Sequence, residues 1–312
     1  MAEYLVTGGC GFIGSHLVGA LLKRGHGVRV LDDLSSGKRE NLAPAARLIV
    51  GDVRDAGTVR AAIEGVDGCF HLAAIASVQR GNEDWSGTHA VNLTGAIHVF
   101  DAARRAKAGA AIPVVYASSA AVYGDVATMP LSEAGLVRPI SAYGADKFGC
   151  ELHGRVGGLV HGVPNIGLRF FNVFGPRQDP KSPYSGVISI FAGRLVAGEA
   201  LTVFGDGGQV RDFIYVGDVV GALLAALAKA DARAPEVFNV CTGRETSVLA
   251  LATLMSELHG IEPRIAFAPP RAGDIRISIG DPSKAKSKLN HEARVTLRDG
   301  LATTLAWLVK GS

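Results

Sequence analysis

Short apolar runs alternate with amphipathic stretches through the first half of the chain. Five runs are rich in β-branched residues and are closed by residues such as Gly, Asp or Ser; they cover 3–7, 27–32, 47–52, 68–73 and 112–118. Such runs are typical of strands in a parallel sheet that is covered on both faces. Between them, residues 12–25, 55–65 and 94–108 space their apolar side chains as amphipathic helices do.

This alternation predicts an α/β fold, a Rossmann-type doubly wound parallel sheet with right-handed crossovers. We place the end of this lobe at residue 167, so that the first domain spans residues 1–167. Beyond it, residues 167–186 look loop-rich, and helices are expected near 186–197, 216–229, 247–259 and 297–309. Residues 168–312 are therefore predicted to form a smaller C-terminal α/β lobe that binds substrate and exchanges strands or helices with the first lobe.

Composition narrows the class of protein. Apolar residues make up 48% and charged residues 20% of 312 positions, which is ordinary for a soluble enzyme. The net charge is +3 without a long basic run, which argues against a nucleic-acid surface. No signal peptide, membrane-spanning run or CxxC pair is present, so we expect a cytoplasmic protein with reduced cysteines, no metal site and no membrane partner. His71 is expected to cap the fourth strand rather than to bind metal.

The stretch TGGCGFIGSH, residues 7–16, contains a glycine loop that can be read in two frames. The glycines are Gly9, Gly11 and Gly14 in the dehydrogenase fingerprint, or Gly8, Gly11 and Gly14 in a looser spacing. A predicted strand precedes the loop and a predicted helix follows it, which is the context that a dinucleotide site requires. In that context the pyrophosphate binds at the N-terminus of the helix.

Asp32 ends the second predicted strand, eighteen residues after Gly14. A carboxylate at this place accepts hydrogen bonds from the adenosine ribose hydroxyls and repels a 2′-phosphate, so it favours NAD over NADP. The alternative is a solvated turn at the end of the strand. Lys38 and Arg39 follow too late to look like a clamp for a 2′-phosphate, and Asp52, after the third strand, is a candidate for the adenine amino group.

Tyr143 and Lys147 are spaced to share one face of the helix that begins near residue 142. A tyrosine hydroxyl ordinarily ionises near pH 10 and is a poor base at neutral pH. An ammonium about 4 Å away would favour the phenolate by roughly 4 kcal/mol at an effective dielectric constant of about 20. Ser118 and Ser119 end the preceding strand, at the sheet edge where ligands bind, and a serine there can relay a proton. Such a tyrosine–lysine pair alone is also common on surface helices.

Seven motifs in order now carry a family resemblance: TGGxGFIG, Asp32, HLAA (71–74), SSAAVYG (118–124), the Tyr143–Lys147 pair, RFFNVFGPRQDP (169–180) and RDFIYVGDV (211–219). From Leu5 to about Leu308 the chain resembles the extended short-chain dehydrogenases/reductases, in particular the NAD-dependent nucleotide-sugar epimerases and dehydratases. The resemblance implies the frame of Gly8, Gly11 and Gly14. It also implies a UDP-sugar substrate and a homodimer formed through the helices near 92–106 and 142–160.

Within this resemblance, Tyr143 is the base that deprotonates the sugar 4-hydroxyl, Lys147 binds the nicotinamide ribose, and Ser119 shares the substrate hydrogen bond. The NAD site implied comprises Gly8, Gly11, Phe12, Ile13, Gly14, Asp32, Asp33, Asp52, Val53, Leu72, Ala73, Ala74, Asn92, Tyr143, Lys147 and Phe170. The substrate site implied comprises Ser77, Ser118, Ser119, Asn172, Val187, Arg211, Arg271, Asp274 and Ser278. Guanidinium groups suit a pyrophosphate, although each arginine taken alone is equally well a solvated surface charge.

Two alanines bear on the reaction. In the family that this chain resembles, the dehydratases carry Asp-Glu directly after the catalytic hydroxyl, where this chain has Ala120 and Ala121. Alanine cannot transfer a proton, so dehydration is disfavoured and C4 epimerisation is favoured. The chain departs from many epimerases at Ala121, where Thr or Ser is frequent, and at Phe170 and Phe174, where Tyr is frequent.

Ser278 bears on the sugar. Family members restricted to plain hexoses tend to place a tyrosine four residues after the aspartate that matches Asp274, and this chain has Ser278 there. The resemblance favours a UDP-hexose 4-epimerase that accepts UDP-GlcNAc and UDP-GalNAc, with UDP-glucose and UDP-galactose as alternative or additional substrates. The other interpretation is that Ser278 only lies on a strand and another group closes the pocket.

Two rival functions stay open: epimerisation or decarboxylation of UDP-glucuronate on the same fold, and a non-catalytic NAD-binding sensor. A sensor would be expected to lose the tyrosine or the lysine. In the helix near 142–160, Gly149, Gly154, Gly157 and Gly158 either permit close helix contact or shorten the helix.

Overall fold

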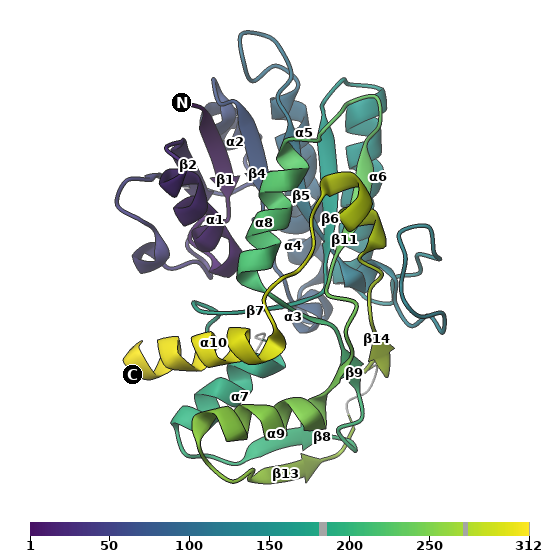
Figure 1. Cartoon of the computed structure of the whole chain (residues 1–312). Coiled ribbons are helices and arrows are strands. Elements are labelled where there is room, and N and C mark those ends of the chain that lie inside the picture. The colour runs from purple at the N-terminus through teal and green to yellow at the C-terminus, as the bar shows by residue number, and fades with distance from the viewer. Residues whose placement is uncertain (181–185, 271–273, 312) are drawn as a thin grey trace.

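The computed structural model describes residues 1–180, 186–270 and 274–311. Its main feature confirms the predicted fold class: seven parallel strands form one sheet in the order β3, β2, β1, β4, β5, β6, β11 (Figure 1). The strands are β1 (Glu3–Thr7), β2 (Gly27–Asp32), β3 (Arg47–Val50), β4 (Gly68–His71), β5 (Val114–Ser119), β6 (Asn165–Phe170) and β11 (Glu236–Val240). The five strands expected from the sequence are all among them.

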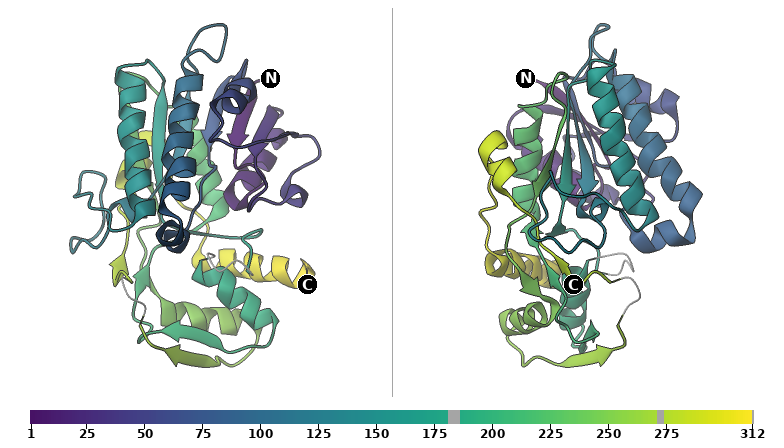
Figure 2. Two further views of the ribbon diagram at one scale, coloured as in Figure 1. Left: turned by 180° about the vertical axis from the view of Figure 1, so that it is seen from behind. Right: turned by 90° about the vertical axis from the view of Figure 1, so that its right-hand side faces the viewer.

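Helices cover both faces of this sheet. On one face lie α1 (Phe12–Lys23) and α8 (Val216–Leu227); on the other lie α2 (Ala56–Ile63), α5 (Gly95–Ala103) and α6 (Ala142–Leu159) (Figures 1 and 2). Two short helices, α3 (Val78–Glu83) and α4 (Trp85–His89), and a π-helical turn at Ala90–Thr94 precede α5. Burial on both faces explains why the strands are apolar throughout; every residue of β4 and β6 is buried.

Two strands of the sheet were not expected from the sequence. In β6, Arg169 interrupts the apolar run, and in β11, Asn239 does so, yet both side chains are buried in the sheet. The expected boundary after residue 167 falls inside β6, and both α8 and β11 bring the second half of the chain back to the first sheet. The expectation of a loop from residue 167 is wrong for its first part, because β6 is followed at once by β7 (Asn172–Phe174).

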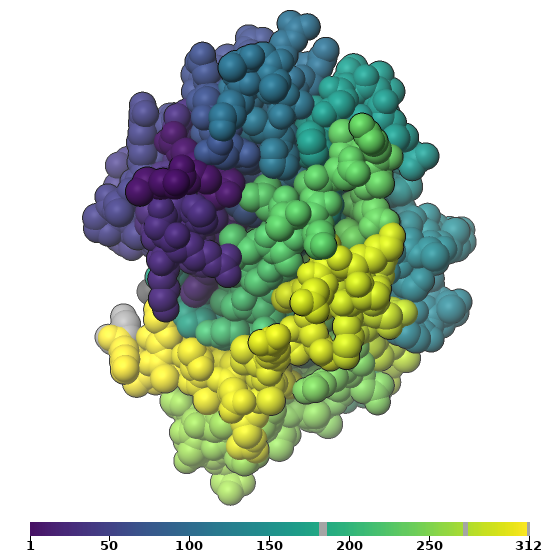
Figure 3. Space-filling view, turned by 45° about the horizontal axis from the view of Figure 1, so that its top comes forward, coloured from purple at the N-terminus to yellow at the C-terminus, as the bar shows by residue number. Residues whose placement is uncertain are grey.

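The second lobe consists of three packed helices and a parallel pair of strands, β8 (Leu201–Phe204) and β13 (Ile265–Ala268), which lie to one side of them (Figure 1). The helices are α7 (Val187–Val196), α9 (Val248–His259) and α10 (Leu297–Gly311), so the helices expected here are confirmed. Its core includes Phe191, Leu201, Leu251, Met255 and Leu301. Short strands lie where the lobes meet: β9 (Val210–Arg211), β10 (Phe213–Tyr215), β12 (Thr246–Ser247) and β14 (Ile277–Ser278) (Figure 1). In the space-filling view the C-terminal segment runs across both lobes (Figure 3).

The glycines of α6 do not shorten it, since the helix is continuous over 18 residues. Two of them allow the helix to lie close to β5 and to the loop before β11. A Cβ atom at Gly154 would lie 2.6 Å from the Tyr116 hydroxyl of β5, and one at Gly158 would lie 2.9 Å from the Ala232 carbonyl oxygen. Through the described residues, no helix is both long and apolar enough to cross a membrane.

Candidate active site

The strand order reverses between β1 and β4, so a crevice is expected at the carboxyl ends of these two strands. The glycine loop lies there. Gly8 has φ of +69°, and a Cβ atom on it would lie 2.7 Å from the Ala73 backbone nitrogen, just beyond β4. A Cβ atom on Gly14 would collide with the Gly8 carbonyl oxygen. Glycine is therefore required at positions 8 and 14, because a side chain at either would overlap the neighbouring backbone.

Gly11 and Gly9 differ in their surroundings. A Cβ atom on Gly11 would meet only the Gly8 carbonyl oxygen, at 3.2 Å, whereas one on Gly9 would meet the Val30 side chain at 2.7 Å. Gly11 also caps α1 without a side-chain hydrogen bond, and no acidic residue lies in the first turn. The backbone N–H groups at Phe12 and Ile13 therefore suit an anion, and the loop fits a dinucleotide pyrophosphate in the frame of Gly8, Gly11 and Gly14.

Asp32 lies at the end of β2, beneath this loop. Its carboxylate accepts backbone hydrogen bonds from Cys10 and Leu34, each at 2.9 Å, and is largely buried. Each oxygen keeps lone-pair capacity that a ribose hydroxyl can use. Burial and the Asp32 charge together raise the pKa of the Cys10 thiol to about 11, so this cysteine stays protonated at neutral pH.

The remaining residues expected near the adenosine take different positions. Asp33 is exposed and accepts hydrogen bonds from Ser35. The Asp52 carboxylate is held by Arg54, whose hydrogen bonds lower the pKa of Asp52. Val53 is buried and packs against Gly95, so its side chain belongs to the core.

Leu72, Ala73 and Ala74 follow β4 beside the glycine loop. The Thr7 hydroxyl accepts the N–H groups of Leu72 and Ala73, both at 3.2 Å. Asn92 fixes the next residue, because its side chain accepts the N–H of Ile75 at 2.8 Å and donates to the carbonyl of Ile75 at 3.2 Å. Asn92 is fully buried in the π-helical turn, and it fixes the loop after β4 from the protein interior.

Tyr143 and Lys147 lie in the first turns of α6, whose N-terminus is capped by the Ser141 hydroxyl. The Lys147 ammonium donates to the carbonyl oxygen of Ala117 at 2.9 Å and lies 5.9 Å from the centre of the Tyr143 ring. Lys147 is almost completely buried, whereas Tyr143 is half-buried. The strand β5 thus fixes the lysine beside the tyrosine ring.

Close packing joins this helix to the turn that carries Ser119. A Cβ atom on Gly144 would lie 2.5 Å from the carbonyl oxygen of Ala121. The Ser119 hydroxyl accepts the N–H of Ala121 at 3.1 Å, and its side chain is half-buried. The structure therefore brings Ser119, Tyr143 and Lys147 together at the carboxyl end of β5.

Ser118, which the sequence analysis places in the substrate site, has its hydroxyl engaged elsewhere. Its side chain is buried and donates to Glu151, one helical turn after Lys147 on α6, at 2.5 Å. Glu151 in turn accepts two hydrogen bonds from Arg169 of β6, at 2.8 and 2.7 Å. The Arg169 guanidinium stacks 4.8 Å from the centre of the Tyr123 ring.

Sequence reasoning missed Glu151 and Arg169. Two signals were available: Glu151 lies four residues after Lys147 on the same helix, and Arg169 is a single charge within an apolar strand. Buried charges of this kind are expected to be paired.

In the second lobe, Arg211 and Asp274 form an ion pair with a distance of 2.5 Å, and Gln209 donates to the same carboxylate at 3.1 Å. Burial lowers the pKa of Arg211, which remains a cation at neutral pH. A pocket of about 370 Å³ opens beside Asp274 and is lined by Gly205, Asp206, Gln209, Pro270, Asp274 and Arg276. Arg271 lies outside the described residues.

The other substrate residues expected from the sequence are spread around the crevice. Asn172, in β7, donates from its backbone and its side chain to the carbonyl of Asp212. Ser278 pairs with Arg211 across β14 and β9. Val187 begins α7, Phe170 ends β6 and is buried, and Ser77 is largely buried as the cap of α3.

Asp212 was not predicted and is fully buried between these strands. Its carboxylate accepts hydrogen bonds from the Thr242 hydroxyl at 2.7 Å and from the backbone N–H groups of Thr242 and Gly243, both at 2.8 Å. Burial raises the pKa of Asp212 while these donors oppose the rise. Asp212 therefore ties the loop after β11 to the strand that carries Arg211.

Comparison with known proteins agrees with this geometry. Residues 4–241 match the model of the NAD dependent epimerase/dehydratase family. The chain belongs to this family. A relative named UDP-glucose 4-epimerase, from Mycolicibacterium smegmatis, is 39% identical over 307 residues, which is 96% of each chain. Dehydratases and decarboxylases of sugar nucleotides are also among the matching relatives.

Two solved structures of the family are similar over nearly the whole chain. The UDP-glucose 4-epimerase of Thermotoga maritima with UDP-glucose has a TM-score of 0.94 and 38% identity, and covers 99% of each chain. The UDP-N-acetylglucosamine 4-epimerase of Methanobrevibacter ruminantium with UDP-N-acetylmuramic acid has a TM-score of 0.94 and 34% identity, covering 100% of this chain and 99% of that one. Solved family structures include complexes with NAD, and NAD is the cofactor of this family.

Proposed function

We propose that this family member is a UDP-hexose 4-epimerase that keeps NAD tightly bound. The observation that carries the proposal is the docking of the Tyr143–Lys147 helix on the Ser119 turn, with alanine at 120 and 121. This site has a base and a hydroxyl, but it lacks the carboxylates that a dehydration would need beside them.

Each residue has a role in this proposal. Tyr143 removes the proton of the sugar 4-hydroxyl, and Ser119 shares the hydrogen bond to that oxygen. Lys147, anchored on the Ala117 carbonyl, favours the phenolate and binds the nicotinamide ribose. Bound NAD supplies a reversible hydride acceptor at C4, so the sugar passes through a 4-keto form with no net redox change.

The rest of the site is proposed to bind NAD and the uridine diphosphate of the substrate. We assign the NAD pyrophosphate to the glycine loop and α1, and the adenosine ribose to Asp32. Asn172, Arg211, Arg271 and Asp274 are proposed to hold the uridine diphosphate. Ser278 would leave room for a 2-acetamido group, so UDP-GlcNAc and UDP-GalNAc are the proposed substrates. UDP-glucose and UDP-galactose are proposed as additional substrates.

A homodimer is proposed from one face of α6. Leu152, Val156, Leu159 and Val160 follow helical spacing and are between 45% and 69% exposed, which is unusual for a contiguous apolar stripe. A second copy of the same helix would cover it. All four cysteines are free and buried, which supports a reducing, cytoplasmic setting.

The test is to incubate the purified protein separately with UDP-GlcNAc, UDP-glucose and UDP-glucuronate and to follow the anomeric protons by NMR. The C4 epimer is expected from the first two, and Tyr143→Phe is expected to abolish turnover while NAD content is kept. If no sugar changes although heat releases one NAD per chain, the protein is a sensor. If only UDP-glucuronate reacts, the substrate assignment is wrong.

A further inference from the structure

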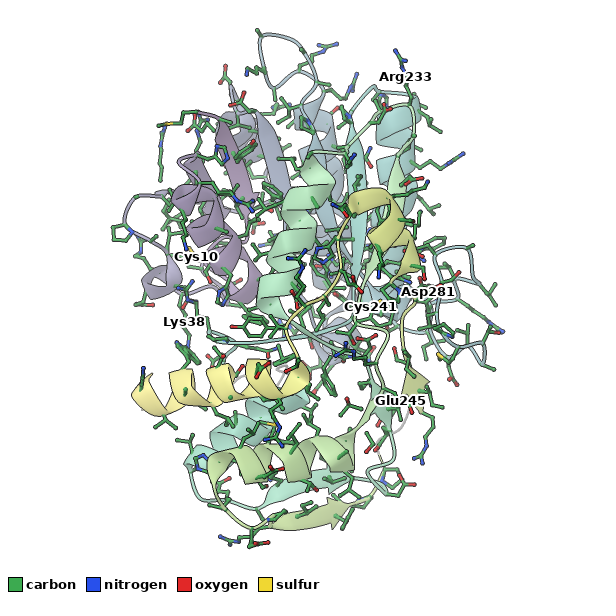
Figure 4. The ribbon with its side chains drawn as sticks, in the orientation of Figure 1. Cys10, Lys38, Arg233, Cys241, Glu245 and Asp281 are labelled. Atoms are coloured by element: carbon green, nitrogen blue, oxygen red, sulfur yellow. The ribbon has the colours of Figure 1, made fainter. Side chains whose placement is uncertain are left out.

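The loop after β7 joins the second lobe to the NAD-binding side of the first lobe. Residues 176–179, here called the strap, contact the first lobe across this junction. The carbonyl oxygen of Pro176 lies 2.9 Å from Nε2 of His16 on α1, so that ring nitrogen donates to it. The Asp179 carboxylate forms an ion pair with Lys38 at 2.7 Å. Figure 4 places Lys38 at the edge of the first lobe that faces the second.

Both contacts are made with segments that adjoin the glycine loop. The backbone N–H of Lys38 and the side chain of Asn41 each donate to the Cys10 carbonyl at 3.0 Å. His16 lies one turn after Phe12, the first residue of α1. The strap therefore spans from α1 to the loop after β2, on either side of the place where the pyrophosphate fits.

Arg177, in the middle of the strap, has a strained backbone with φ of +68°. A non-glycine residue keeps such a conformation only when its surroundings impose it, and this occurs often at functional sites. Here both neighbours are held, because Pro176 is bonded to His16 and the Gln178 side chain accepts the Ser189 hydroxyl at 2.6 Å.

Arg177 directly follows Pro176, whose carbonyl is bonded to His16, so its backbone lies beside the first turns of α1. Burial is the main reason that the pKa of His16 is lowered, and the charge of Arg177 lowers it further. No ion pair of Arg177 occurs among the salt bridges of the described residues. A guanidinium in this position would add to the partial positive charge of the helix N-terminus, where a doubly charged pyrophosphate fits.

We propose that the strap closes over NAD from the sugar-binding lobe, with Arg177 binding the cofactor pyrophosphate and Lys38–Asp179 fastening the strap. The strap thus retains NAD between the two half-reactions. This deepens the proposed function and rests on it for the need to retain the cofactor. Release of NAD is nevertheless measurable without any sugar, so the two proposals fail separately.

The experiment measures how fast NAD leaves the purified holoenzyme. The protein is diluted into buffer with charcoal, and the NAD still bound is released by heat and assayed at intervals. Arg177→Gln and Arg177→Gly are both expected to speed release by about tenfold or more, since each removes a charged hydrogen-bond donor. Arg177→Lys should keep most of the retention.

Arg177→Gly is the decisive variant, because glycine relieves the backbone strain while removing the cation. If it releases NAD no faster than wild type, the cation does not bind the cofactor and the proposal is overturned. Lys38→Gln should speed release by roughly two- to fivefold, as expected for one exposed ion pair, and Lys38→Arg should not.

Lys286→Gln serves as a matched control, since it breaks the exposed Lys286–Glu292 pair elsewhere on the surface. If it speeds release as much as Lys38→Gln does, the fastening role is wrong. Normal NAD retention in a protein that converts no sugar would contradict the epimerase proposal but not the proposed role of the strap.

Discussion

The Glu151 carboxylate on α6 accepts two hydrogen bonds from the Arg169 guanidinium on β6, and both side chains are buried. The pair ties the helix that carries Tyr143 and Lys147 to the sheet. Ser118 donates a third hydrogen bond to the same carboxylate.

Glu151→Gln should therefore lower the free energy of unfolding by about 3–5 kcal/mol, because it leaves the Arg169 charge buried and uncompensated. Chemical denaturation measures this. The double variant Glu151→Leu with Arg169→Met is the control, and it should cost less than Glu151→Gln because neither charge remains. A single variant within about 0.5 kcal/mol of wild type would contradict the role of the pair.

Gly144→Ala tests the docking of the catalytic helix. The added methyl group would lie 2.5 Å from the backbone oxygen of Ala121, so the start of α6 must shift. A shift of about 1 Å can cost on the order of a hundredfold in rate, and we expect at least about a tenfold loss of kcat with NAD still bound. Gly149→Ala is the control, since its methyl group would meet only the flexible Leu93 side chain. Equal losses in both variants would argue against a docking effect.

Ser278→Tyr tests the sugar pocket. A phenol ring beside Arg211 and Asp274 should exclude the acetamido group, and selection by such a steric contact is worth about 1–3 kcal/mol. The ratio of kcat/KM for UDP-GlcNAc over UDP-glucose should fall by about tenfold or more. The same loss on both sugars would show that Ser278 is not the specificity gate.

His71 should make stability depend on pH. Its ring is almost completely buried and lies 2.8 Å from the Thr7 hydroxyl, and burial lowers its pKa from 6.5 to about 3, with Lys147 adding to the effect. The unfolded chain therefore binds a proton that the folded chain does not, so stability is full above pH 6.5 and falls as the pH drops toward 3. His71→Gln should flatten this part of the curve. The role of His71 would be contradicted if the difference in free energy of unfolding between wild type and variant stayed the same from pH 7 to about pH 4.

Leu152→Arg and Val156→Arg test the proposed dimer. Each places a charge in the exposed stripe of α6, and burying an unpaired charge in an interface is unfavourable. Light scattering should give a dimer for wild type and a 32.4 kDa monomer for either variant. Val309→Arg, on the exposed part of α10, is the control and should stay dimeric. A wild-type monomer would rule the proposal out.

The sequence by itself determined the features that depend on residues close together in the chain. Apolar periodicity located the five strands of the first half and the four helices of the second. The glycine spacing and Asp32 predicted a dinucleotide loop, because a sharp turn and a helix N-terminus are local features. Tyr143 and Lys147 were found for the same reason, since one helical turn separates them.

Only the tertiary structure decided which side chains meet across elements. Polar residues interrupt β6 and β11, so the sequence pattern does not predict either as a buried strand. Both are buried because Arg169 is hydrogen-bonded to Glu151 and Asn239 to Tyr123. Ser118 and Ser119 are adjacent in the sequence, yet the Ser118 hydroxyl donates to Glu151 on α6, whereas the Ser119 hydroxyl accepts the N–H of Ala121 in the turn after β5. The strap contacts join residues more than a hundred positions apart, and no local pattern encodes such a pairing.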